Sequence, residues 1–269
     1  MKTANPCLTR RVRWMASLHL SAALGILVGC QTPPGAAPSP GEVHRPIAPQ
    51  SIVVGRSLEG RALACQVLGD GGEVVLIMAT IHGNEPAGTP LVRRLIERLA
   101  AEPKLLCGRR VVVLPVANPD GLAGGTRRNA RGVDLNRNFP ATNWRPRKPN
   151  GPAPLSEPES RAIHDLLERY APIRIVSIHQ PIACIDYDGP GRALAQAMAA
   201  SSGLPLKKLG GKPGSLGSYA GINRGIPIIT VELPRSASRL SSASLWARYG
   251  RMLLTAIAFP DAPPPMSGR

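Results

Sequence analysis

The sequence predicts an α/β fold, a single-domain α/β/α sandwich in which helices cover both faces of one mixed, mostly parallel sheet. Four apolar runs are continuous rather than alternating, as in strands that are buried on both faces. Segments with helical periodicity separate these runs along the chain. Hydrophobic residues make up 43% of the 269 residues, so a core can form although aromatic residues contribute only 3%.

The four apolar runs are the expected strands, and they occupy residues 74–80, 111–116, 173–179 and 226–233. The expected helices occupy residues 86–102, 157–170, 190–202 and 242–258. At the start of the second helix, Ser156 is expected as the N-cap, with Glu159 in the capping-box position. We see no internal repeat, so these elements belong to one folded domain, residues 51–259.

Two segments precede this domain. Residues 1–29 have a basic start and a short apolar stretch, which is typical of a signal peptide rather than of a membrane span. Residues 30–50 are Pro-rich after Cys30 and indicate a semi-rigid tether, about 60 Å long if extended. The tail, residues 260–269, is not expected to be ordered.

The string Leu27-Val28-Gly29-Cys30 resembles the bacterial lipobox, in which the cysteine becomes the lipidated first residue of the mature protein. The alternative is an ordinary signal peptide in which Cys30 is incidental. The small residue before Cys30 and the tether after it favour lipidation. Gln31 rather than Asp follows, which resembles an outer-membrane sorting signal. We therefore expect an anchor in the cell envelope, on the periplasmic face of the outer membrane.

The formal net charge is +16, and a basic protein can bind nucleic acid, anionic lipid or an acidic polymer. No basic helix interleaved with aromatic residues is present, so we expect no nucleic-acid partner. Three cysteines remain after Cys30, namely Cys65, Cys107 and Cys184, and they allow at most one disulfide.

Polar residues follow or end each of the four expected strands. His82 and Asn118 come just after the first two, His179 ends the third, and Glu232 lies near the end of the fourth. In a sheet of this kind, function gathers beyond the carboxyl ends of the strands. We therefore expect these side chains to meet at one edge of the sheet.

His82 and Glu85 have a spacing that allows both to reach one metal ion. The alternative is that Glu85 lies at the N-terminus of a helix, where a negative charge interacts favourably with the helix dipole. His179 is a third candidate ligand. The alternative is a buried histidine whose ring nitrogens are hydrogen-bonded within the protein and bind no metal. Two His and one carboxylate leave a fourth position for water, which is the pattern of catalytic rather than structural zinc.

Glu232 interrupts an apolar strand, which is costly unless the carboxylate is paired, lies at a solvated edge or acts as a base on an activated water. Residues 127–140, RRNARGVDLNRNFP, concentrate arginines and amides in one loop. The planar guanidinium of arginine can bind a carboxylate through two hydrogen bonds and can stabilise an oxyanion. The alternative for this segment is a basic loop at the surface.

The strings HGNE, NPDG, RRNARGVDLNRNFP, SEPES, SIH and TVELP occur in this order, and the set resembles the zinc carboxypeptidase family, typified by carboxypeptidase A. The likeness is closer to its bacterial murein peptide amidase branch, which cuts the γ-D-glutamyl–diaminopimelate bond. VGRSLEG, ATNW, ACID and PGSLGSY carry that likeness, and the resemblance covers about residues 53–258.

The resemblance implies one zinc ion per chain, held by His82, Glu85 and His179. It also implies that Glu232 is the general base and that Arg127 stabilises the oxyanion. The remaining implied roles are Asn136 and Arg137 binding the terminal carboxylate of the substrate, and Asp134 as the hydrogen-bond partner of His82.

The loop with Gly217, Ser218 and Tyr219 corresponds to the floor of the side-chain pocket in carboxypeptidases, and its small residues do not favour a large apolar group. Asp186 or Asp188 could bind the ammonium of diaminopimelate, or simply belong to a polar loop. The chain departs from this branch at two places, which concern the substrate rather than the zinc chemistry: Arg131 stands where Asn is usual, and residues 145–155 are basic and Pro-rich.

The leading hypothesis is zinc-dependent hydrolysis of an amide bond in peptidoglycan peptides. Alternatives are a general zinc carboxypeptidase, a zinc deacylase of N-acyl amino acids, which shares the HGNE and DLNR strings, and a non-enzymatic wall-binding lipoprotein. The ordered SEPES, SIH and TVELP strings favour the peptidase, and retention of the candidate ligands argues against a decayed scaffold. The oligomeric state is not predicted.

Overall fold

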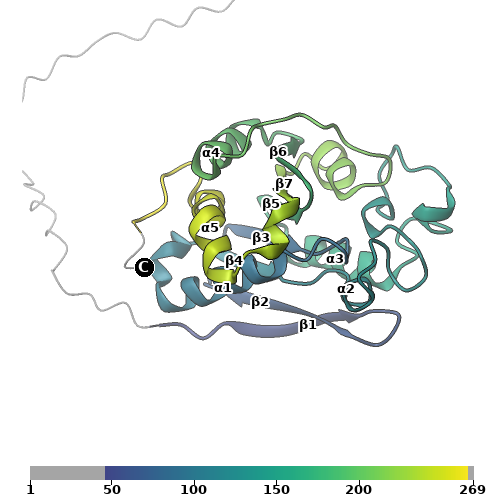
Figure 1. The fold of residues 1–269 in the computed structure, drawn as a ribbon, viewed down its shortest axis with the longest axis horizontal. Helices are drawn as coiled ribbons and strands as arrows, with labels where there is room; N and C mark the ends of the chain where they lie inside the picture. The colour runs from purple at the N-terminus through teal and green to yellow at the C-terminus, as the bar shows by residue number, and fades with distance from the viewer. Residues whose placement is uncertain (1–45, 266–269) are drawn as a thin grey trace, which may run out of the picture. The chain divides into compact units, whose positions relative to one another are not determined.

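The computed structural model describes residues 46–265, and within them the chain folds around one sheet (Figure 1). The strand order is β1-β2-β4-β3-β5-β7-β6. Strands β4, β3, β5 and β7 are mutually parallel, whereas the pairs β1–β2, β2–β4 and β6–β7 are antiparallel. The strands are β1 (Gln50–Arg56), β2 (Ala62–Leu68), β3 (Val74–Ala79), β4 (Arg110–Leu114), β5 (Arg174–His179), β6 (Ile182–Asp188) and β7 (Ile228–Pro234).

All four expected helices are present, and each begins and ends within two residues of its expected bounds. They are α1 (Gly88–Ala101), α3 (Pro158–Tyr170), α4 (Arg192–Ser202) and α5 (Ser242–Ala258). A short helix, α2 (Pro119–Gly124), follows β4. The predicted α/β sandwich with a mixed sheet is therefore confirmed, with β1, β2 and β6 added to the four expected strands.

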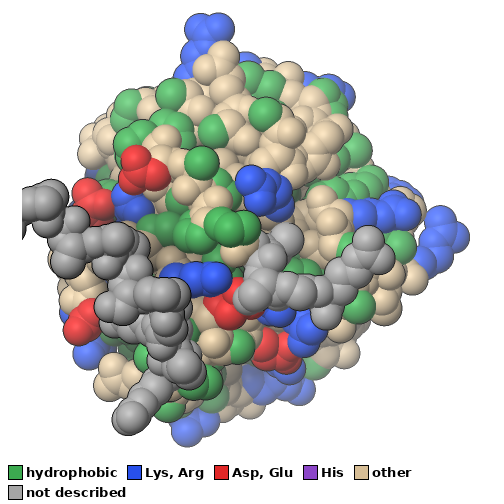
Figure 2. Space-filling model, turned by 90° about the vertical axis from the view of Figure 1, so that its left-hand side faces the viewer, with side chains coloured by type: hydrophobic (Ala, Val, Ile, Leu, Met, Phe, Trp, Pro, Cys, Tyr) green, Lys and Arg blue, Asp and Glu red, His purple; other side chains and the backbone are tan. Residues whose placement is uncertain are grey.

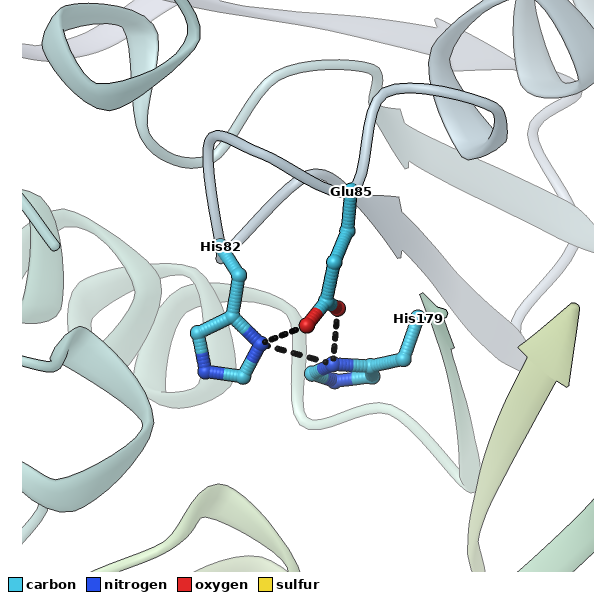
Figure 3. Close-up of side chains that lie close together, drawn as sticks. All are labelled: His82, Glu85 and His179. Carbon is cyan, nitrogen blue, oxygen red and sulfur yellow. Dashed lines mark hydrogen bonds and ion pairs between the residues drawn. The ribbon is translucent and has the colours of Figure 1, made fainter. Parts of the chain in front are cut away.

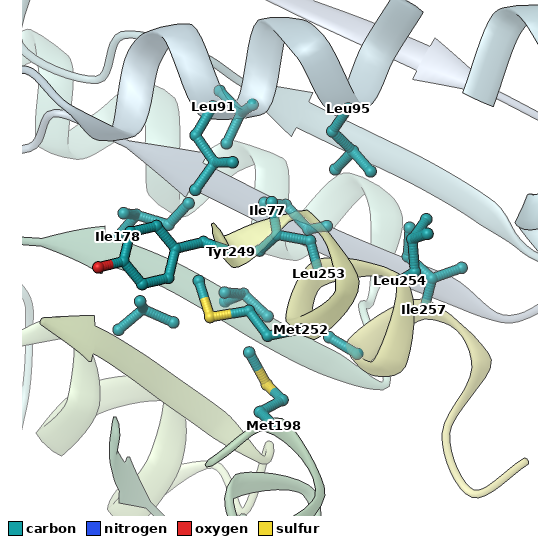
Figure 4. Packing of buried hydrophobic residues seen from close by; sticks show 14 of the residues in the cluster. Ile77, Leu91, Leu95, Ile178, Met198, Tyr249, Met252, Leu253, Leu254 and Ile257 are labelled. Carbon is teal, nitrogen blue, oxygen red and sulfur yellow. The ribbon is translucent and has the colours of Figure 1, made fainter. Parts of the chain in front are cut away.

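Helices cover the two faces of the sheet and form two hydrophobic clusters. One cluster joins α1, α4 and α5 to strand residues such as Ile77 and Ile178, and Figure 4 shows Tyr249 and Leu253 of α5 packed there. The other cluster joins α3 to the opposite face, through residues such as Leu76 and Ile175. Because β3 and β5 contribute alternate side chains to both clusters, all of their residues are buried, as the continuous apolar runs predicted.

The register of the parallel strands brings the polar strand ends together. Ile178 of β5 lies opposite Ala79 of β3 on one side and Val231 of β7 on the other, and His179 lies opposite Glu232. The antiparallel β6 begins beside this edge, because Cys184 pairs with Glu232. Residues from β3, β5, β6 and β7 therefore meet at one edge of the sheet.

The expected N-cap of α3 is wrong. Glu157 takes this position with extended backbone, and no side chain caps the helix by a hydrogen bond. The reason is Pro158 at the first helical turn, which disfavours helical geometry in the residue before it. Ser156 instead donates a hydrogen bond to Glu157 Oε1 at 2.8 Å.

The expected signal peptide and Cys30 lie outside the described residues, as do most of the tether and residues 266–269. Within the described part, Ile47 already packs against the core and donates its backbone N–H to Ala100 O at 2.9 Å. No helix between residues 46 and 265 has the length and apolar character needed to span a membrane.

On the face shown in Figure 2, Lys and Arg side chains are scattered, and no histidine is visible.

Candidate metal and catalytic site

Three buried side chains converge at the carboxyl edge of the sheet (Figure 3). His82 Nδ1 lies 3.0 Å from Glu85 Oε1 and 3.2 Å from His179 Nδ1, and His179 Nδ1 lies 3.0 Å from Glu85 Oε2. Their ligand-type atoms all lie within 4.8 Å of one another. The three therefore point their donor atoms into one small space.

The loop that carries His82 and Glu85 rests directly on the turn after β4. A Cβ atom added to Gly83 would lie 1.9 Å from the carbonyl carbon of Gly121, so only glycine allows the two backbones to meet. Asn118 reinforces this contact, since its amide donates to Ile81 O at 3.3 Å and its Oδ1 accepts from Gly121 N at 2.9 Å. The HGNE and NPDG strings thus support one another in space.

Both imidazoles are oriented by a partner at their second nitrogen. His82 Nε2 lies 3.1 Å from Asp134 Oδ1, and His179 Nε2 lies 3.0 Å from Ser177 Oγ. Such partners fix the tautomer and the direction of the other nitrogen. Asp134 is the partner that the sequence predicts for His82, whereas Ser177 was missed, although the period-two alternation of β5 places it on the same side as His179.

Arg127 pairs with two of these acids, through NH1 to Glu85 Oε1 at 2.9 Å and through Nε to Asp134 Oδ2 at 3.2 Å. Burial raises the pKa of Glu85, but hydrogen bonds from His179 and His82 outweigh it and hold the pKa below its usual range. Burial likewise raises the pKa of Asp134, and it is outweighed by the hydrogen bond with His82 and the nearby arginines. Both carboxylates are therefore ionised at neutral pH.

Glu232 is only 8% exposed and faces the same edge. Its Oε2 accepts a long hydrogen bond, 3.4 Å, from Ile182 N. Burial raises the pKa of this carboxyl, against the smaller opposing effect of His179. A carboxylate whose pKa is raised is a better proton acceptor than an ordinary glutamate.

A pocket of about 210 Å³ opens beside the cluster. Asn136, Arg137, Asp186 and Glu232 line it together with Arg127, the three candidate ligands and Asp188. No carboxylate between residues 46 and 265 forms an ion pair with Arg137, whose pKa is lowered by burial. Burial raises the pKa of Asp186, whose Oδ1 accepts from Leu209 N at 2.9 Å, whereas Asp188 pairs with Lys208 at 2.7 Å.

Ser218 and Tyr219 do not line this pocket. The hydroxyl of Ser218 donates to Lys212 O at 2.8 Å and accepts from Asn143 Nδ2 at 3.0 Å, so it holds the loop together from inside. The ring of Tyr219 stacks against the rings of Phe139 and His164, with centroid distances of 6.2 and 5.8 Å. Gly217 does line the pocket, where an added Cβ would lie 2.2 Å from Asp188 Oδ2.

The donor set fits a zinc ion. Two imidazole nitrogens and one carboxylate oxygen are the usual ligands of a catalytic zinc, and all three are buried at one point. The orienting partners Asp134 and Ser177 match the second-nitrogen contacts that ligating histidines make. Gln180 N also donates to Glu85 Oε2 at 3.1 Å, which fixes the carboxylate.

Comparisons with known proteins agree with this geometry. Residues 44–187 match the family model described as zinc carboxypeptidase. Murein peptide amidase A of Escherichia coli K12 is 37% identical over 182 residues, covering 61% of this chain and 72% of that protein.

Two solved structures give the same picture of the fold. The murein-tripeptide amidase of Escherichia coli O157 has a TM-score of 0.65 at 32% identity, covering 80% of this chain and 94% of that one. A carboxypeptidase A from Helicoverpa armigera, at 21% identity, shares the fold with a TM-score of 0.68, covering 79% of this chain and 69% of that one.

Proposed function

Because the chain belongs to the zinc carboxypeptidase family and is a hydrolase, we propose that it cleaves an amide bond in peptidoglycan peptides, between γ-D-glutamate and diaminopimelate. The observation that carries this proposal is the pocket beside the histidine cluster. It presents one arginine without a carboxylate partner and one buried acid, as a zwitterionic end group requires.

His82, Glu85 and His179 are the residues that would hold zinc. Held there, a zinc ion would supply Lewis-acid chemistry to the scissile carbonyl and to the attacking water. Glu232 accepts the proton of that water and later donates it to the leaving amine. Arg127 presents its guanidinium at the same point and stabilises the negative charge that develops on the carbonyl oxygen.

Arg137, with Asn136 beside it, binds the free carboxylate of diaminopimelate next to the scissile bond, a charge-assisted contact. Asp186 binds the distant ammonium of the same residue. This assignment is supported by two relatives whose names state activity on murein peptides. A general carboxypeptidase for apolar residues would not be expected to bury an acid in this pocket.

The substrate assignment predicts that the chain cleaves L-Ala-γ-D-Glu-diaminopimelate but hardly cleaves the same tripeptide amidated at the carboxylate beside the scissile bond. Arg137→Ala should cost about 2–5 kcal/mol in transition-state binding of the free acid, because a charge then loses its partner. Mass spectrometry of timed digests measures both effects. Arg137→Lys is the matched variant, because it keeps the positive charge but cannot form the two parallel hydrogen bonds of a guanidinium.

Equal cleavage of the acid and the amide would contradict this assignment. Cleavage of neither tripeptide, with trimming of peptides ending in Lys or Leu, would instead indicate a general carboxypeptidase. Release of acyl groups from N-acyl amino acids would favour the deacylase alternative. Binding of murein without any cleavage would favour a wall-binding lipoprotein.

We also propose lipid anchoring at Cys30, in the cell envelope, from the lipobox-like string alone. Cys30→Ser should move the protein from the membrane fraction to the soluble fraction, because acyl chains supply the membrane affinity. Fractionation with immunoblotting measures this, and Cys107→Ser is the control. A Cys30→Ser protein that still pellets with membranes after a high-salt wash would rule out the anchor.

A further inference from the structure

A second hollow, of about 180 Å³, adjoins the candidate metal ligands at Glu85. Four residues line both this hollow and the large pocket, namely Glu85, Arg127, Gln180 and Pro181. Asn136, Arg137 and Asp186 line only the large pocket. If the leaving residue occupies the large pocket, the acyl residue extends into this one. Its lining is Asn84, Glu85, Arg127, Gln180, Pro181, Arg235 and Ser238.

The residues that line this hollow are mainly cationic or carry amide groups. Glu85 is the acidic residue among them, and its carboxylate already pairs with the two histidines and Arg127. Gln180 is fixed, since its Nε2 donates to Ser238 Oγ at 2.9 Å and its Oε1 accepts from Ala87 N at 3.0 Å. These contacts leave Arg235 as the charged group of the hollow that is still available to a ligand.

Arg235 directly follows β7 and begins a turn, Arg235–Arg239, so its backbone is anchored three residues from Glu232. Its side chain is exposed, and no described residue forms an ion pair or side-chain hydrogen bond with it. The long side chain thus lines the hollow as an uncompensated cation. Such a group suits a carboxylate, which it can bind through two parallel hydrogen bonds.

A γ-linked glutamyl residue offers this carboxylate. In an ordinary peptide the α-carboxyl group of each residue forms the next amide bond. In a γ-linkage the side-chain carboxyl forms that bond, and the α-carboxylate stays free, a short aliphatic chain away from the scissile carbonyl. A γ-linked glutamyl residue therefore carries a free α-carboxylate, a group that an α-linked residue lacks because its α-carboxyl forms the scissile amide bond.

We propose that Arg235 binds the free α-carboxylate of the acyl residue and selects γ-glutamyl peptides over peptides without this charge. The inference rests on the proposed amidase function and adds a second recognition point to it. Arg137 recognises the leaving residue, and Arg235 recognises the residue on the other side of the bond.

The test compares L-Ala-γ-D-Glu-diaminopimelate with the analogue whose glutamyl α-carboxylate is a carboxamide. We expect wild-type kcat/KM to favour the free acid about tenfold, the lower end for a charge-assisted bond at an exposed site. Arg235→Ala should reduce this ratio to near one by slowing the free acid alone, and Arg235→Lys should retain part of it. Arg239→Ala is the matched control, since Arg239 is exposed in the same turn but does not line the hollow.

An Arg235→Ala enzyme that keeps the wild-type ratio would overturn the inference, as would equal loss in Arg235→Ala and Arg239→Ala. So would a wild-type enzyme that cleaves both tripeptides equally, and in that case the amidase function itself stands. If wild-type enzyme cleaves neither tripeptide, the proposed function fails first, and the inference falls with it.

Discussion

Glu232→Gln is expected to lower kcat by about 10²–10⁴-fold while leaving the zinc content of the protein unchanged, because a positioned general base contributes a factor of this size. The amide keeps the shape of the side chain and can still accept the hydrogen bond from Ile182 N. It cannot accept the proton of the attacking water. Glu232 is not one of the three clustered donors, so the change leaves the candidate ligands in place.

Steady-state kinetics on the murein tripeptide, with metal analysis of the same preparations, measures this separation of roles. Glu97→Gln is a matched control, since Glu97 is an exposed acid on α1 that pairs with Arg94. An unchanged kcat in Glu232→Gln would show that another group accepts the proton. Loss of zinc together with activity would show that Glu232 acts as a ligand instead.

The parallel centre of the fold was predictable because its strands are buried on both faces and read as continuous apolar runs. The edge strands were not. In β2, buried residues such as Leu63 and Cys65 alternate with small exposed ones, and Gln66 interrupts the apolar run. In β6, polar residues that face the pocket, such as Asp186, interrupt the pattern in the same way.

The site was predictable where a residue directly follows a strand, and less so where distant loops meet. His82, His179 and Glu232 follow or end strands, and the parallel register brings them together. The stacking of Tyr219 against Phe139 and His164 depends on the paths of loops, and so does the position of Arg235 at the second hollow. Spacing along the chain does not encode such contacts.

The SEPES string contributes to the site from a distance. Asn129 Nδ2 donates to Glu157 Oε2 at 2.8 Å and to Glu159 Oε2 at 3.2 Å, both on fully buried side chains. Asn129 Oδ1 in turn accepts from Val133 N at 3.0 Å. Arg131, the departure from the usual Asn, pairs with Glu157 at 3.2 Å and so reinforces this anchor. These contacts fix the loop that carries the partners of Glu85 and His82.

Replacing His179 by alanine is expected to abolish stable zinc binding and, with it, nearly all hydrolysis. One of three protein donors is lost, and His82 and Glu85 alone cannot complete the site. The same loss should appear in thermal unfolding. A ligand present at about a thousand times its Kd stabilises the folded state by roughly 4 kcal/mol. In a domain of this size, this corresponds to about 8–16 °C in Tm.

Chelation of the wild-type protein should therefore lower its Tm by about 10 °C, whereas His179→Ala should already have the lower Tm and show no further change with chelator. Differential scanning calorimetry with and without chelator measures this, and metal analysis gives the zinc content. His164→Ala is the control, since His164 stacks on Tyr219 outside the cluster and should keep both zinc and the chelator effect. A His179→Ala protein that retains about one zinc per chain, or a metal-free wild-type protein with full activity, would contradict the assignment. Because the Tm readout does not depend on the substrate, it tests the metal site even if the peptide that is cleaved differs from the one proposed.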